Sequence, residues 1–152
     1  MKNLLIASIA ALALTACGNA ADSGSASKSV EATKSATTAD VKTVTIAALV
    51  YADWCGSCKV LDPTIKKAKA MGPLPGVEFI VLDYTDKNDD NFYAQAEAAG
   101  VESAIRAYLD GTVKTGQLLL VDVDDAKVIN KVTKVDAVPE ILSKIKAAVS
   151  AS

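Results

Sequence analysis

Histidine is absent from the 152-residue sequence, and the chain has few aromatic residues and no basic cluster. Without histidine, the chain lacks the commonest general base and the commonest protein metal ligand. The formal net charge is −2 and aromatic residues make up 5% of the chain, so nothing in the composition favours nucleic-acid binding. Cysteine is also scarce: the three cysteines present fall into two separate motifs.

Long apolar runs are missing as well, because the N-terminal run over residues 4–14 is too short to span a bilayer. It follows the basic start Met-Lys-Asn, a pattern typical of a signal peptide. The run ends in Leu-Thr-Ala-Cys-Gly at residues 14–18, which resembles the lipobox of bacterial lipoproteins. The resemblance implies a lipoprotein signal peptide over residues 1–16 and a lipidated Cys17 as the first mature residue. An ordinary signal peptide that contains a cysteine is the alternative.

This N-terminal motif predicts a location in the bacterial cell envelope, with the protein lipid-anchored and facing the periplasm. Several acyl chains on one residue would anchor it firmly, and an exported location lets a disulfide persist. Gly18 is not the aspartate that retains lipoproteins in the inner membrane of enteric bacteria, which favours the outer membrane. Residues 17–40 are mostly alanine, serine, threonine and lysine without helix or strand periodicity, and predict a flexible tether.

Alternating strand and helix patterns fill residues 41–152, which we expect to form one folded domain. Apolar and β-branched runs predict strands over residues 41–51, 77–84, 117–123 and 127–132. Helical spacing predicts helices after Cys55, from a cap at Asp89 or Asp90 to Gly100, over 103–109, and from Val138 to Val149. This order predicts an α/β fold in which helices flank a central mixed β-sheet of about four strands.

The candidate chemistry lies between the first predicted strand and its helix, in Trp-Cys-Gly-Ser-Cys-Lys at residues 54–59. A cysteine at a helix start faces unpaired backbone N–H groups and the helix dipole, which favour its thiolate. The thiolate is the nucleophile of disulfide exchange, and a second cysteine one turn further on can close a short disulfide. Cys55 and Cys58 are therefore the candidate catalytic residues.

Residues 51–59, Tyr-Ala-Asp-Trp-Cys-Gly-Ser-Cys-Lys, with Pro63 five residues after the second cysteine, resemble the thioredoxin family. The sequence of this stretch is most similar to that of the periplasmic C-terminal domain of the transmembrane thiol:disulfide interchange reductase. The resemblance implies a thioredoxin-like fold and dithiol/disulfide exchange in the reducing direction, without a cofactor. It implies protein or small-molecule disulfides and thiols as substrates, and a membrane thiol reductase as a possible electron donor.

The same resemblance implies a role for each residue of the motif. Cys55 would be the exposed nucleophile, and Cys58 the buried thiol that resolves the mixed disulfide. Trp54 would shield the sulfurs and form part of the docking surface. The residues expected to tune the redox poise are Gly56, Ser57 and Lys59. Pro63 would have a structural role, because it should bend the helix that follows the cysteines.

Two positions depart from the family pattern. Leu49 stands where thioredoxins carry a buried aspartate, six residues before the first cysteine. Gly116, after Thr115, aligns with the family's cis-proline, which presents backbone to the substrate and keeps metal from the thiols. A non-proline cis bond costs ~3 kcal/mol, so we expect Gly116 to be trans or irregular. Thr115 and Gly116 remain candidates for substrate binding.

Other functions of the two cysteines remain open. They could bind a soft metal or an iron–sulfur cluster, with Gly116 leaving them uncovered. The domain could instead be a non-catalytic adaptor whose cysteines react slowly. A zinc site needs about four N or S ligands, which one chain without histidine cannot supply. A purely structural disulfide would close too small a loop to stabilise the fold much.

Overall fold

The computed structural model describes residues 42–152. In this part of the chain, the strands β1 (Thr45–Tyr51), β2 (Val77–Asp83), β3 (Gln117–Asp122) and β4 (Lys127–Thr133) form a sheet of order β2-β1-β3-β4. β1 pairs parallel with β2 and antiparallel with β3, and β4 pairs antiparallel with β3. The predicted mixed four-stranded sheet is confirmed. The predicted signal peptide, Cys17 and the predicted tether lie outside the described residues.

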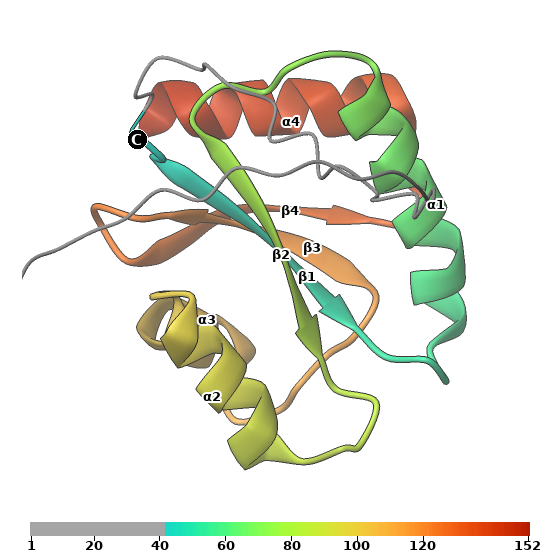
Figure 1. The fold of residues 1–152 in the computed structure, drawn as a ribbon, viewed down its shortest axis with the longest axis vertical. Helices are drawn as coiled ribbons and strands as arrows, with labels where there is room; N and C mark the ends of the chain where they lie inside the picture. Colours follow the sequence, from blue (N-terminus) through green and yellow to red (C-terminus); the bar gives the residue numbers. More distant parts are fainter. Residues whose placement is uncertain (1–41) are drawn as a thin grey trace, which may run out of the picture. The chain divides into compact units, whose positions relative to one another are not determined.

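Helices cover both faces of the sheet, as predicted. Figure 1 shows α1 (Gly56–Ala70) and α4 (Val138–Ala151) on one face, and α2 (Asp89–Ala98) and α3 (Glu102–Leu109) on the other. Alternate residues of β1 pack into the two cores: Leu49 lies among residues of α1 and α4, whereas Val50 lies among residues of α2 and α3. Burial on both faces explains why β1 is a continuous apolar run rather than an alternating one.

The start of α2 differs from the prediction. Its N-cap is Asn88, whose side-chain oxygen accepts a hydrogen bond from the N–H of Asn91 at 3.0 Å. The predicted cap at Asp89 or Asp90 is wrong. Both residues lie in the first turn, where their carboxylates interact favourably with the helix dipole. Three consecutive residues with capping chemistry made the boundary ambiguous in the sequence.

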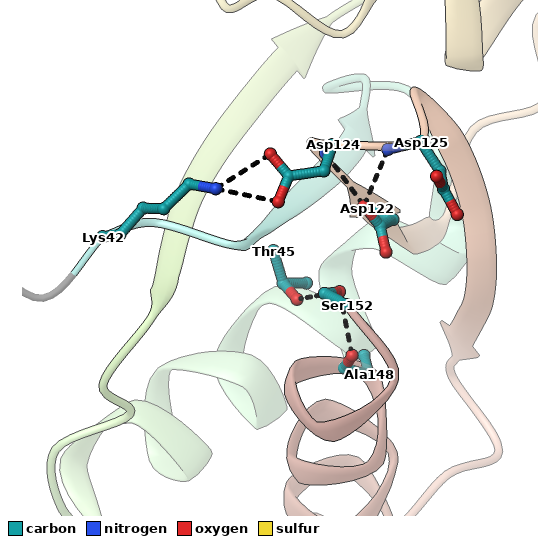
Figure 2. A network of polar contacts seen from close by, with 7 residues as sticks. All are labelled: Lys42, Thr45, Asp122, Asp124, Asp125, Ala148 and Ser152. Carbon is teal, nitrogen blue, oxygen red and sulfur yellow. Dashed lines mark hydrogen bonds and ion pairs between the residues drawn. The ribbon is translucent and has the colours of Figure 1, made fainter.

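The end of the sheet remote from Cys55 is held by a polar network (Figure 2). Asp122 at the end of β3 is 2% exposed, and its carboxylate accepts hydrogen bonds from the N–H groups of Asp124 at 2.9 Å and Asp125 at 3.0 Å. Lys42 forms an ion pair with Asp124 at 2.8 Å. The hydrogen bond from Asp125 is the main cause that lowers the pKa of Asp122, against the opposing effect of burial.

This network makes stability pH-dependent. A carboxyl group whose pKa is lowered by folding stabilises the fold above its unfolded pKa of about 3.9, and this stabilisation is lost as the pH falls through the folded pKa. We therefore expect Asp122→Asn to lower the free energy of unfolding at neutral pH, with the gap to the wild type closing on acidification. Urea titrations across a pH series measure this gap.

Asp125→Asn is the matched control, because it removes a charge from the same turn at an exposed side chain. It should keep close to wild-type stability at every pH. An Asp122→Asn gap that stays constant down to acid pH would show that the charge of this carboxylate contributes nothing.

Candidate active site

Cys55 is the N-cap of α1, four residues after Tyr51 at the end of β1. Its Sγ accepts a hydrogen bond from the N–H of Cys58 at 3.2 Å. The two cysteines form a disulfide, with their Cα atoms 5.3 Å apart. Cys55 is 7% exposed, so it is buried rather than exposed as expected, and Cys58 is fully buried as expected. The hydrogen bond from the N–H of Cys58 and the dipole of α1 both favour negative charge on the sulfur of Cys55 once the disulfide is reduced.

Cys58 has different polar surroundings. Its Sγ lies 3.8 Å from the carbonyl oxygen of Val50, the next-to-last residue of β1. A thiol can donate a weak hydrogen bond to this acceptor, which favours the protonated form. Leu49 is buried among apolar residues of α1, α4 and β3. The sulfur of Cys55 thus faces a donor, whereas the sulfur of Cys58 faces an acceptor.

Gly116 lies directly against this pair of cysteines, just before β3. Its φ is +83°, and its N–H donates a hydrogen bond to the carbonyl oxygen of Val50 at 2.8 Å. A Cβ at this position would lie 2.6 Å from Cβ of Ser57 and 3.2 Å from Sγ of Cys55. The backbone therefore approaches the sulfur closely, rather than leaving a gap beside it. Proline could make neither the positive φ nor the N–H bond.

Trp54 is 49% exposed, and residues of the loop between β2 and α2 hold its side chain in place. Its Nε1 donates a hydrogen bond to the carbonyl oxygen of Thr85 at 3.1 Å, and Nζ of Lys87 lies 5.1 Å from the ring centre. The ring also meets Tyr84 edge-on. Sequence analysis missed these contacts. The strand–helix–strand order was the available signal, because such a unit is typically parallel and places the loop after β2 beside the cysteines.

The remaining predicted residues lie around the same turn. Gly56 is exposed with open space around it, and Ser57 is half-buried against Gly116. Lys59 is exposed on α1, and Pro63 lies inside that helix as predicted. Thr115 is half-buried next to Gly116. Within the described residues, Gly116 lies against Cys55 and Ser57, whereas Gly56, Lys59 and Thr115 are neighbours of these residues in the sequence.

Tyr51 and Asp53 form a polar pair at the end of β1. The hydroxyl of Tyr51 donates to Oδ1 of Asp53 at 3.0 Å, which is the main cause that raises the pKa of Tyr51. Asp53 itself is exposed, and its carboxylate binds the hydroxyl of Tyr51.

Within residues 42–152, no group of three or more cysteine, aspartate or glutamate side chains is placed to hold a metal ion. Over the same residues, no helix combines the length and the apolar character needed to cross a membrane.

A four-stranded mixed sheet with helices on both faces, and a cysteine pair at the start of α1, defines a thiol:disulfide oxidoreductase with a thioredoxin fold. The family model described as Thioredoxin matches residues 28–102, which include both cysteines. This match and the paired cysteines confirm the thioredoxin fold and the enzyme class predicted from the sequence.

Among solved structures, the chain is similar to Trxlp from Edwardsiella tarda EIB202, with a TM-score of 0.44 and 13% sequence identity. The likeness covers 69% of this chain and 84% of that chain. No curated protein matches the chain.

The close approach of Gly116 leads to a test. Gly116→Ala should lower the free energy of unfolding by about 1–2 kcal/mol through the left-handed backbone, and further through the clash with Ser57. The control is Gly111→Ala, because Gly111 has a φ of +76° but no atom within 4 Å of its ideal Cβ. Denaturant titrations should show the larger loss for Gly116→Ala, and Ser57→Gly should restore part of it. Equal losses in the two alanine variants would contradict the crowding.

Proposed function

We propose that the protein is a membrane-anchored, periplasm-facing oxidoreductase that reduces disulfides by exchange at Cys55 and Cys58. The observation that carries this proposal is the hydrogen bond from the N–H of Cys58 to Sγ of Cys55 at the start of α1. It favours an ionised sulfur at the more accessible of the two cysteines.

In the reduced protein, the thiolate of Cys55 attacks one sulfur of a substrate disulfide. A mixed disulfide forms, and the first substrate sulfur leaves as a thiolate that takes up a proton. Cys58 then loses its proton and attacks Sγ of Cys55, which releases the second substrate sulfur as a thiolate. Two electrons have passed to the substrate, and Cys55 and Cys58 are joined as a disulfide.

The reducing direction is supported by the similarity of the motif to the periplasmic domain of the transmembrane interchange reductase. A membrane thiol reductase would restore the dithiol after each cycle. In this scheme, the exposed ring of Trp54 contacts the substrate polypeptide beside Cys55. On the side of β3, the cysteines are bordered by Thr115 and Gly116. The reduction potential of the cysteine pair is tuned by Gly56, Ser57 and Lys59.

The membrane anchor is supported by the N-terminal sequence, in which Leu-Thr-Ala precedes Cys17 after an apolar run. We expect cells to incorporate labelled palmitate into the full chain and into Ser57→Ala, but not into Cys17→Ala. Gel autoradiography of the purified proteins measures the label. Equal labelling of Cys17→Ala would contradict lipidation at this residue.

The exchange mechanism predicts a trapped intermediate. In Cys58→Ala the mixed disulfide cannot be resolved, so we expect covalent complexes with substrate proteins that disappear on treatment with dithiothreitol. Non-reducing gels of envelope extracts detect these complexes. Cys55→Ala is the matched control, because it keeps one buried cysteine in the same turn but loses the nucleophile.

Cys55→Ala should form few or no complexes. An absence of complexes with Cys58→Ala would contradict exchange and favour the adaptor alternative. The direction of electron transfer is tested in cells that contain the wild type, by rapid alkylation of free thiols, which preserves the redox state of Cys55 and Cys58. If the two cysteines are mainly oxidised at steady state, the reducing role is contradicted.

A further inference from the structure

A continuous series of hydrogen bonds joins α2 to the turn that leads into Cys55. It begins at Gln95, whose side-chain amide donates to the carbonyl oxygen of Asp83 at 2.9 Å and accepts from the N–H of Asp83 at 2.9 Å. β2 lies at the edge of the sheet. Gln95 therefore satisfies backbone groups at the end of β2 that a further strand would otherwise bind.

The next bonds run from Asp83 to Thr85. Oδ1 of Asp83 accepts from the N–H of Thr85 at 2.8 Å and also from its hydroxyl. The hydroxyl oxygen of Thr85 in turn accepts from the N–H of Asp53 at 3.0 Å. Since the hydroxyl has only one proton, which it donates to a carboxylate, the direction of the series is fixed and the bond is charge-assisted.

Thr85 thus holds both residues that precede Cys55. Its hydroxyl binds the backbone of Asp53, and its carbonyl oxygen accepts the indole N–H of Trp54 at 3.1 Å. These two residues lie between the end of β1 and the N-cap of α1. Figure 1 shows the β1–α1 turn and the β2–α2 loop at the same end of the sheet, as the parallel pairing of β1 and β2 requires.

We propose that Thr85 is a positioning residue of the oxidoreductase site, held in place by Asp83. It acts through Trp54, by fixing the half-exposed ring and the backbone entering Cys55 in the orientation that a polypeptide substrate meets. This inference rests on the docking role proposed above for Trp54. A small disulfide that touches only the sulfur of Cys55 does not need this surface, so Thr85 favours macromolecular substrates.

The test compares two probes, reduction of insulin and reduction of 5,5′-dithiobis(2-nitrobenzoate). Thr85→Val keeps the side-chain shape but loses the hydroxyl. It should raise KM for insulin about two- to tenfold, the factor expected from one net hydrogen bond, and leave the rate with the small disulfide within about twofold. Thr85→Ser, which keeps the hydroxyl, should restore KM. Asp83→Asn should raise it in the same direction by less.

Fluorescence gives a second measurement, because Trp54 is the only tryptophan of the chain. Acrylamide should quench its emission more strongly in native Thr85→Val than in the wild type. Thr133→Val is the matched control: Thr133 also donates its N–H and hydroxyl to a nearby carboxylate, that of Asp136. It should change neither KM nor quenching.

The outcomes separate this inference from the proposal on which it rests. If Trp54→Ala leaves KM for insulin unchanged, Trp54 has no docking role and the inference falls with it. If Trp54→Ala raises KM but Thr85→Val does not, the docking role stands and the role of Thr85 is overturned. If Thr85→Val slows both probes equally, Thr85 serves the fold and is not a positioning residue for docking.

Discussion

The chemistry depends on one local interaction, the hydrogen bond from the N–H of Cys58 to Sγ of Cys55 in the first turn of α1. It exists because β1 ends and α1 begins within a few residues, which puts the first cysteine at the N-cap and the second inside the helix. Burial of β1 on both faces holds its end in place. A helix that started one residue later would leave this sulfur without the N–H groups that stabilise its charge.

The sheet topology supplies the rest of the site. Because β2 runs parallel to β1, the loop after β2 arrives beside the cysteine turn and brings Thr85 with it. Because β3 runs antiparallel to β1, the start of β3 lies beside the end of β1. Gly116, just before β3, therefore also lies against the cysteine turn. Three segments far apart in the sequence therefore meet at one end of the sheet, and the opposite end is closed by the carboxylate of Asp122 (Figure 2).

Local patterns in the sequence were enough to predict the strands, the helices and the cysteine pair, because periodicity and a short motif are properties of adjacent residues. The cap of α2 could not be read from them, since Asn88, Asp89 and Asp90 offer the same chemistry. The bonds of Thr85 join residues 31 and 32 positions apart, and no local signal marks them. The glycine before β3 was noticed only as a missing proline, whereas its N–H bond and close approach became visible in three dimensions.

The carbonyl oxygen of Val50 accepts a hydrogen bond from the N–H of Gly116 and, once the disulfide is reduced, faces the thiol of Cys58. The contact between β1 and the residue before β3 is therefore thermodynamically linked to the reduction potential of the cysteine pair. Any change that strengthens the bond to the thiol form alone makes the pair a stronger oxidant, by about 30 mV for each 1.4 kcal/mol. Substitutions in the apolar core behind Val50 can thus shift the redox poise of this domain without touching either sulfur.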